Sequence, residues 1–277
     1  MRKFWKKKRI FMKIYDKENK RIIVFEEKAT SEFWDKHWQT DNFIEKVKAG
    51  KDNKFKKFTT KFLKPGAKIL EGGCGIGQNV YGLKSWGYNV YGVDFAKETI
   101  KKIKDNFPEL KVFVQDVRKL DFPDNFFDGY WSLGVIEHFW SGYDEILKEM
   151  KRIIKPKGYL FLNFPWMSPL RKLKASRGLY KTLGKEKMGE NDFYQFILDK
   201  KRVIKDLREN GFELIQEYPL DATKGIKDEI SLLKPFLQKI YDSQNIIIKG
   251  IRFLISILFS KIAGHTILLI FKNEKVL

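Results

Sequence analysis

The chain has 277 residues, with 55 Lys and Arg against 35 Asp and Glu, a net charge of +20 and 43% hydrophobic residues. This hydrophobic content excludes a disordered chain, and the single cysteine, Cys74, excludes an internal disulfide framework and a multi-cysteine zinc site. The first residues, MRKFWKKKRIF, contain no apolar stretch of the kind found in a secretory signal, so we expect a cytoplasmic protein.

The positive charge is concentrated in two segments. Residues 1–65 carry a net charge of +11 and residues 151–187 carry +10, whereas residues 66–150 between them carry −3. Blocks of like charge are often no more than solvated surface. Charge alone therefore leaves the partner open, with nucleic acid as one alternative.

Residues 1–60 are expected to be helical or irregular, forming an N-terminal basic arm and an aromatic helical segment. Phe33, Trp34, Trp38 and Phe43 recur at spacings that place them on one face of a helix. This face either packs on the core or forms a lid over a ligand site. The remaining residues, 61–277, are predicted to form one domain.

From Lys68 onward, short apolar strands alternate with helical stretches, which indicates an α/β fold with a mostly parallel, doubly wound sheet. The predicted strands are Lys68–Leu70, Asn89–Val93, Val112–Val114, Phe127–Ser132, Tyr159–Phe164, Phe212–Tyr218 and Thr266–Phe271. The predicted helices are Gln78–Trp86, Lys97–Phe107, Asp144–Ile154 and Lys201–Asn210.

A helical insertion is predicted over residues 219–264, before the last strand. Within it, Lys249, Arg252, Ser256 and Ser260 recur at steps of three and four among Ile, Leu and Phe, which indicates a helix over Ile246–Ile262 with a narrow polar stripe. The longest uncharged run, Ile262–Phe271, has ten residues and is too short to span a bilayer. Core packing, a homodimer contact and peripheral membrane contact all remain open for this helix.

The most informative motif is the run Ile69-Leu70-Glu71-Gly72-Gly73-Cys74-Gly75-Ile76-Gly77, in which a strand leads into glycines and then a helix. Glycines allow a tight turn and let a ligand approach the backbone N–H groups at the start of the helix. The phosphate-binding motifs do not fit, because Gln78 and Asn79 follow Gly77 where a P-loop needs Lys and Ser or Thr, and the third glycine of the dinucleotide fingerprint is missing.

Three successive strands end in a carboxylate. Glu71 comes immediately before the glycines and would attract a cation rather than a pyrophosphate. Asp94 ends the second strand and is placed to accept both hydroxyls of a ribose, and Asp116 follows the third strand, where it can accept from an exocyclic amine such as that of adenine. The pattern predicts a cationic nucleoside ligand at the carboxyl edge of the sheet.

On these residues the chain resembles the class I S-adenosylmethionine-dependent methyltransferases, in particular the small-molecule subgroup that includes the ubiquinone-pathway enzymes. Asp128, which opens the fourth strand, and the turn Ile154-Lys155-Pro156-Lys157-Gly158 are also similar to that subgroup. The resemblance implies a seven-stranded Rossmann-like sheet with an antiparallel last strand, and S-adenosylmethionine as cofactor. The residues it implies for the cofactor are Glu71, Gly73, Cys74, Gly75, Gly77, Asp94, Phe95, Asp116, Val117, Ser132 and Leu133.

A methyl acceptor with a hydroxyl group needs a general base. The segment after the fourth strand supplies Glu137 and His138, and His138 is the candidate base because histidine titrates near neutral pH. The alternative is that this pair packs beneath the cofactor. Some related quinone methyltransferases use Glu-x-x-Glu-His as a metal set; Gly134 occupies the first position here, so no metal is predicted.

The acceptor is expected to be a small-molecule or lipid-linked anion, O-methylated by direct transfer, because the basic acceptor-loop insertion at 165–198 follows the fifth strand. Arg171, Lys174, Arg177 and Tyr194 are the predicted acceptor-binding residues. Two alternatives remain, a nucleic-acid methyltransferase and a methyltransferase-like fold that binds without catalysing. The segment Asn163-Phe164-Pro165-Trp166 is similar to an amino-methyltransferase signature, but it follows the fifth strand instead of the fourth.

Overall fold

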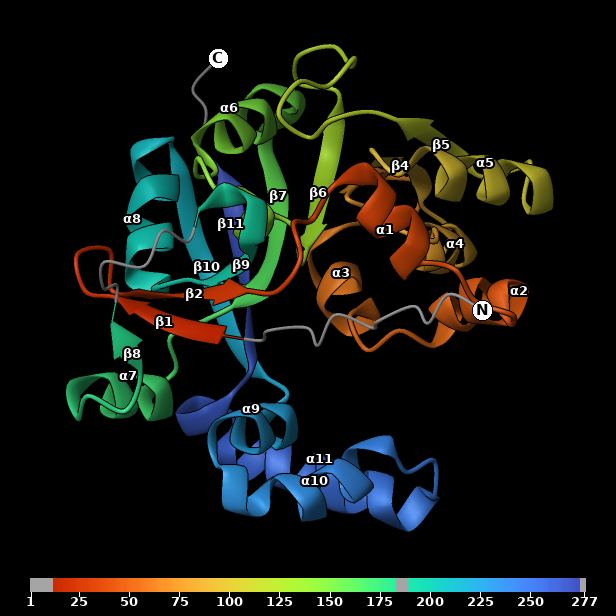
Figure 1. Cartoon of the computed structure of the whole chain (residues 1–277). Coiled ribbons are helices and arrows are strands. Elements are labelled where there is room, and N and C mark those ends of the chain that lie inside the picture. The colour runs from red at the N-terminus through yellow and green to blue at the C-terminus, as the bar shows by residue number, and fades with distance from the viewer. Residues whose placement is uncertain (1–11, 183–188, 275–277) are drawn as a thin grey trace, which may run out of the picture.

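The computed structural model describes residues 12–182 and 189–274. Its centre is a seven-stranded sheet of order β10-β11-β7-β6-β3-β4-β5 (Figure 1). Its strands are β3 (Lys68–Gly72), β4 (Asn89–Asp94), β5 (Lys111–Val114), β6 (Phe127–Leu133), β7 (Ile154–Pro165), β10 (Phe212–Leu220) and β11 (Thr266–Asn273). Strands β3 to β7 pair in parallel, and β11 runs antiparallel to both of its neighbours, β7 and β10. The predicted fold class is confirmed.

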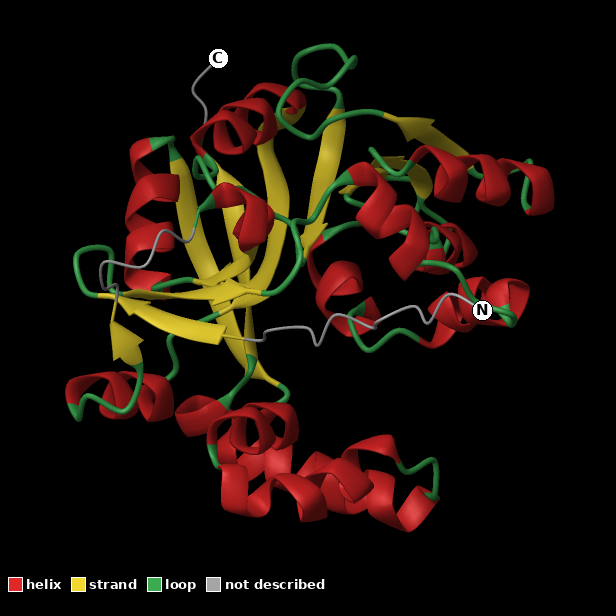
Figure 2. Ribbon diagram, in the orientation of Figure 1, coloured by secondary structure: helices red, strands yellow, loops and turns green. Residues whose placement is uncertain are grey.

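Helices cover both faces of this sheet (Figure 2). They include α4 (Gln78–Ser85), α5 (Lys97–Asn106), α6 (Asp144–Ile153) and α8 (Lys200–Glu209), all within one residue of the predicted bounds. Alternate strand residues face two separate cores: Phe161 packs with Val80 and Ile103 of the α4 and α5 side, while Leu160 packs with Met150 and other residues of the α6 and α8 side. This period of two accounts for strands that read as continuous apolar runs, since both faces are buried.

The N-terminal segment differs from the prediction. It is predicted to be helical or irregular, but its described part starts with a hairpin of β1 (Met12–Asp16) and β2 (Arg21–Phe25). This hairpin joins β8 (Lys181–Thr182) and β9 (Phe193–Ile197) in a second, four-stranded sheet. The Asp16–Arg21 turn has no Asn-Gly pair to signal it, and the buried residues of β2 do not alternate with exposed ones. Residues 1–11 of the predicted basic arm lie outside the described residues.

The hairpin is followed by α1 (Ser31–His37), α2 (Phe43–Lys48), the 3-10 turn η1 (Ala49–Asp52) and α3 (Lys56–Phe62). The segment predicted as a basic acceptor loop contains α7 (Pro169–Ser176) together with β8 and β9, so it is structured rather than a plain loop. In that segment the 3-10 turn η3 (Glu190–Asp192) precedes β9. The insertion before β11 contains α9 (Ala222–Glu229), the 3-10 turn η4 (Ser231–Leu233), α10 (Lys234–Asp242) and α11 (Ile246–Ala263).

Candidate functional site

The glycine loop lies between β3 and α4, at the carboxyl edge of the central sheet. Gly73, Gly75 and Gly77 have φ angles of +73°, +49° and +75°, which a residue with a side chain rarely adopts. A Cβ atom on Gly75 would lie 2.8 Å from Cζ2 of Trp38, so the indole ring packs directly on the loop. The glycines therefore serve both the turn and the close approach of an aromatic ring.

Glu71 is the buried acid at the end of β3. Its side chain is 2% exposed, and its Oε1 accepts a hydrogen bond of 2.6 Å from Nδ2 of Asn79. Among the described residues its Oε2 has no hydrogen-bond partner, although it is buried. Burial raises the pKa of this carboxyl to about 8. An unsatisfied buried carboxylate oxygen is a ready acceptor for a cationic donor such as an ammonium group.

Asp94 ends β4 and faces the glycine loop. Its Oδ2 accepts from the backbone N–H of Gly75 at 2.8 Å, and its Oδ1 accepts from that of Ala96 at 2.9 Å. Burial raises its pKa, and the backbone hydrogen bonds oppose that rise. Each oxygen retains a lone pair, so this fixed carboxylate can still accept two hydroxyl groups.

Asp116 is held differently from the other two acids. Arg118 binds it through its side chain, with Nη2 lying 2.6 Å from Oδ2, and through its backbone N–H, 2.9 Å from Oδ1. Burial would raise the pKa of Asp116, but the hydrogen bonds from Arg118 lower it overall. Much of the acceptor capacity of Asp116 is therefore already used within the protein.

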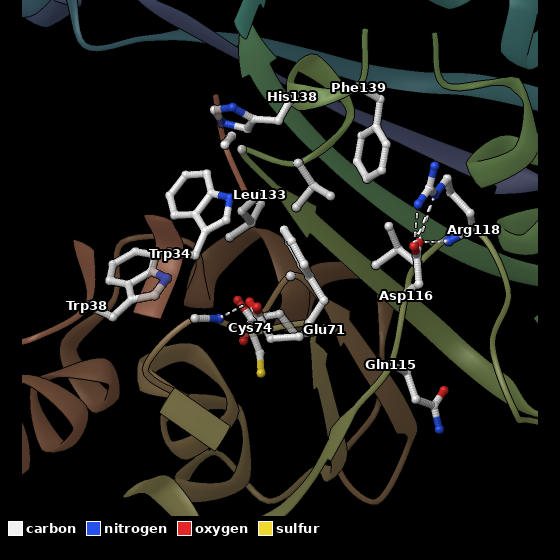
Figure 3. A pocket seen from close by; sticks show the side chains of 18 of the residues that line it. Trp34, Trp38, Glu71, Cys74, Gln115, Asp116, Arg118, Leu133, His138 and Phe139 are labelled. Atoms are coloured by element: carbon white, nitrogen blue, oxygen red, sulfur yellow. Dashed lines mark hydrogen bonds and ion pairs between the residues drawn. The ribbon is translucent and has the colours of Figure 1, made fainter. Parts of the chain in front are cut away.

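His138 lies on the opposite side of the cavity from Glu71 (Figure 3). Its Nδ1 lies 2.8 Å from the carbonyl oxygen of Tyr194 in β9. Because a carbonyl only accepts, Nδ1 carries the proton and Nε2 keeps its lone pair. Burial lowers the pKa of this imidazole to about 4, so the ring is neutral at pH 7.

An aromatic cluster surrounds His138. The ring of Trp34 meets it edge-on at a centroid distance of 5.0 Å, and that of Tyr194 does so at 5.1 Å. Trp34 also stacks on Trp38, and Phe33 packs against Tyr194. These contacts make α1 one wall of the cavity.

Two polar contacts hold α1 against the start of α5. Ser31 donates from its hydroxyl to the carbonyl of Phe95 at 2.8 Å. Asp35 accepts from both the backbone N–H and the hydroxyl of Thr99, each at 2.8 Å. The helix predicted as a lid thus lies across the segment that carries Asp94.

The cavity bounded by these elements has a volume of about 420 Å³. The predicted residues that line it are Glu71, Gly73, Cys74, Gly75, Asp94, Phe95, Asp116, Val117, Leu133 and His138. Lining residues that the sequence did not point to include Lys28, Gln115, Arg118, Phe139, Trp140 and Glu190. Phe139 and Trp140 directly follow the Glu137-His138 pair, and that adjacency was the signal available in the sequence.

Several predicted site residues do not line the cavity. Gly77 is the N-cap of α4, and Ser132 is fully buried at the end of β6. Glu137 is 2% exposed, and burial raises its pKa to about 8, so it lies within the core beneath the site. Tyr194 acts on the site through its contacts with His138.

The predicted acceptor-binding cations also lie away from this cavity, which corrects the sequence-based placement. Arg171 is 1% exposed and donates from Nε to Glu229 of α9 at 3.0 Å. Lys174 binds the same carboxylate at 2.8 Å, and both Lys174 and Arg177 border a separate hollow beside α9. These cations surround Glu229, because a buried carboxylate without a partner would lower the stability of the fold. Burial by itself would raise the pKa of Glu229, but the neighbouring cations lower it to about 2.

Cys74 is buried, and burial raises the pKa of its thiol, so it is a small spacer in the loop rather than a nucleophile. Within residues 12–182 and 189–274, no group of three or more His, Cys, Asp and Glu side chains is arranged to hold a metal ion. Glu71, Asp94 and Asp116 all line the cavity, and a cationic ligand beside Glu71 would favour the ionised form of that carboxyl.

The central sheet is parallel except for its last strand, a glycine loop follows its first parallel strand, and acids stand at the ends of the strands around that loop. These features together are typical of a nucleoside-binding α/β domain of the class I methyltransferase type. The comparisons agree with that class. Residues 70–162 match the family model described as a methyltransferase domain.

Two curated relatives and one solved structure illustrate the similarity. The chain is 35% identical over 102 residues to 2-methyl-6-phytyl-1,4-hydroquinone methyltransferase of Synechocystis, covering 35% of this chain and 32% of that protein. It is 27% identical over 174 residues to phosphoethanolamine N-methyltransferase 3 of Arabidopsis thaliana, covering 60% of this chain and 35% of that protein. A SAM-dependent methyltransferase from Methanosarcina mazei superposes with a TM-score of 0.53 at 20% identity, covering 78% of this chain and 96% of that one.

The matches thus span only about a third of the length of these curated relatives, and the solved structure supports the fold alone. Residues 70–162 form a class I S-adenosylmethionine-dependent methyltransferase domain, and S-adenosylmethionine is the cofactor of that domain. The unsatisfied Oε2 of Glu71 fits the amino group of this cofactor, and the two oxygens of Asp94 fit its ribose.

Proposed function

We propose that the protein transfers a methyl group from S-adenosylmethionine to a hydroxyl oxygen of a small-molecule acceptor. The observation that carries this proposal is the orientation of His138, whose Nδ1 is bound to the carbonyl of Tyr194 while the ring lines the cavity. A neutral imidazole held in one tautomer keeps Nε2 free to accept a proton from a hydroxyl group, although burial, which lowers the pKa of the ring to about 4, makes it a weaker base than a free histidine.

The cofactor supplies an electrophilic methyl group on a positively charged sulfur. In such a transfer the methyl group would leave the cofactor's sulfur, which would keep the electron pair of the broken bond, for the hydroxyl oxygen of the acceptor, and Nε2 of His138 would take the hydroxyl proton. Trp34 of α1 and Trp38, which directly follows α1, line the cavity and would exclude water from it, while Asp94 and Glu71 would hold the cofactor. Alignment of this kind can lower the barrier by about 7–11 kcal/mol, and general-base help adds about 10²–10⁴-fold in rate.

The acceptor we propose carries an apolar or aromatic body and a hydroxyl group. Trp34, Phe139 and Trp140 line the cavity together with His138, and aromatic walls bind rings and hydrocarbon groups well. A lipid-linked acceptor is compatible with these walls. An anionic acceptor would have to use Lys28 or Arg118, which already pair with Glu190 and Asp116, so the anionic character expected from the sequence receives less support.

The test measures formation of S-adenosylhomocysteine with purified protein and three kinds of acceptor: simple alkylated hydroquinones, ethanolamine phosphate and bulk RNA. We expect turnover with the hydroquinones, lowered by His138→Ala. Turnover with ethanolamine phosphate would replace the oxygen acceptor by a nitrogen one. Turnover with RNA alone would make the protein a nucleic-acid methyltransferase, and cofactor binding without turnover on any acceptor would favour a binding protein.

A further inference from the structure

Helix α11 turns its polar residues toward the protein and exposes its apolar ones, which is the reverse of the usual amphipathic helix. Its polar stripe faces the protein: Ser260 is 7% exposed, and Nη1 of Arg252 donates to the carbonyl of Tyr241 in α10 at 2.6 Å. Its apolar side chains face outward, with Phe253 64% and Leu258 67% exposed. A soluble helix normally buries such residues, so this face requires an apolar environment outside the chain.

The same exposure continues onto the neighbouring helix. Phe236 of α10 is 64% exposed and Leu232 of η4 is 88% exposed. Helices α10 and α11 pack beside each other on α9, at the end of the molecule away from α6 (Figure 1). We call this surface the apolar helix face, and its members used below are Leu232, Phe236, Ile247, Phe253, Leu254 and Leu258.

Charge identifies the occupant of this face. Residues 234–263 contain five Lys and Arg and a single acid, Asp242. Lys234 and Lys239 of α10 and Lys261 of α11 are exposed on the same two helices. A two-fold contact with a second copy would place this positive set against itself, because the same patch meets itself in an isologous dimer. An anionic lipid surface supplies both the apolar layer and the opposite charge.

The position of the insertion agrees with a surface-bound protein. Thr266, which starts β11, pairs with Pro165 at the end of β7 and with Leu220 at the end of β10. Helices α9 to α11 therefore leave the sheet at its carboxyl edge, the edge on which the glycine loop and His138 border the cavity. Over the described residues, no helix is both long and apolar enough to cross a bilayer, so contact would be along the membrane plane.

We propose that the apolar helix face docks on the surface of an anionic lipid bilayer. Its Ile, Leu and Phe side chains enter the boundary between headgroups and acyl chains, and Lys234, Lys239 and Lys261 meet the phosphates of the headgroups. The docked protein presents the carboxyl edge of its sheet on the membrane side. Docking does not depend on methyl transfer, so it is tested without cofactor or acceptor.

The test is cosedimentation of the full-length protein with sucrose-loaded vesicles of phosphatidylcholine alone or of phosphatidylcholine with phosphatidylglycerol. We expect binding to the mixed vesicles that weakens as salt is added. The triple variant Phe253→Ser, Leu254→Ser, Leu258→Ser should bind at least about 100-fold more weakly. Its matched control removes exposed apolar side chains elsewhere (Ile44→Ser, Val114→Ser and Ile215→Ser) and should bind as the wild type does.

A second variant separates charge from apolar contact. Lys234→Gln, Lys239→Gln and Lys261→Gln together should weaken binding to the mixed vesicles by about 100-fold, since each charge near an anionic surface contributes about fivefold. Wild-type protein that stays in the supernatant with both kinds of vesicle overturns the proposal. If sedimentation velocity then shows a dimer that the Phe253, Leu254 and Leu258 variant dissociates, the occupant is a second copy. Equal loss of binding in the control variant also overturns it.

Discussion

Replacing Asp94 with Asn gives the sharpest test of the cofactor site. Asp94 is 6% exposed, and each of its oxygens already accepts one backbone N–H, from Gly75 and Ala96. The proposed ribose contacts use the remaining lone pairs. Asn is nearly the same shape, but its amide nitrogen cannot accept, so one backbone hydrogen bond and one ribose contact are lost.

The size of the effect follows from those contacts. A hydrogen bond to a charged group contributes about 1.5–3 kcal/mol, and Asn also loses the charge at the contact that it keeps, so the total is about 3 kcal/mol. The dissociation constant for S-adenosylmethionine should therefore rise by about 100-fold. The loss of one backbone hydrogen bond should also lower the free energy of unfolding by about 1 kcal/mol.

Titration calorimetry with S-adenosylmethionine measures this change directly. The control is Asp105→Asn, which removes an exposed carboxylate on the same side of the sheet, in α5, and should leave the affinity unchanged. Circular dichroism melting checks that Asp94→Asn remains folded. An affinity for the folded variant within about threefold of the wild type would refute the assignment of Asp94 to the ribose.

Three further predictions address the base, the buried ion cluster and the acid beneath the glycine loop. His138→Ala should lower kcat by about 10²–10³-fold and leave the affinity for S-adenosylmethionine unchanged, measured by turnover and calorimetry, and an unchanged kcat would remove His138 from proton transfer. Arg171→Met should lower the free energy of unfolding by about 3–5 kcal/mol, because it removes one buried partner of Glu229. The double variant Arg171→Met with Glu229→Gln should recover part of that loss, measured by urea unfolding. Equal stabilities of the single and double variants would contradict the buried ion pair as the cause. Burial raises the pKa of Glu71 in the folded protein to about 8, above its value in the unfolded chain, so ionisation of this carboxyl favours the unfolded state. The wild type should therefore lose stability relative to Glu71→Gln as the pH rises from 5 to 8. A difference between the two melting temperatures that stays constant over that range would contradict the raised pKa.

The sequence predicted the central sheet well because its signals are local. Strands buried on both faces give apolar runs, and the glycines after Leu70 mark the turn into α4 without any information from elsewhere in the chain. The acids of the site were found for the same reason: Glu71 and Asp94 each sit at the end of a recognisable strand.

The long-range arrangement could not be found in this way. The pairing of β2 with β9 joins residues more than 160 positions apart, and no local pattern announces it. The charge of Arg171 predicts contact with an anionic acceptor, but its partner is Glu229, which lies 58 positions later in the chain. No local pattern in the sequence indicates that these two residues meet. The contact between Nδ1 of His138 and Tyr194 likewise depends on β9 being brought against the turn after β6.

The polar stripe of α11 shows the same limit. Its period was correctly interpreted as a helix, but which face would meet the protein could not be deduced from the period. The structure turns Ser260 inward and Leu258 outward, which reverses the usual arrangement. The packing of α11 on α9, α7, β10 and α10 determines this orientation.

Transfer of a methyl group from this protein's cofactor to a small molecule can be followed with S-adenosylmethionine labelled in its methyl group. Purified protein is incubated with the labelled cofactor and a small-molecule extract of cells, and the products are analysed by mass spectrometry. We predict a metabolite that gains the labelled methyl group with the wild type and gains much less with His138→Ala. Labelled cofactor that binds but never passes its methyl group to any component of the extract would show that the protein is not a small-molecule methyltransferase.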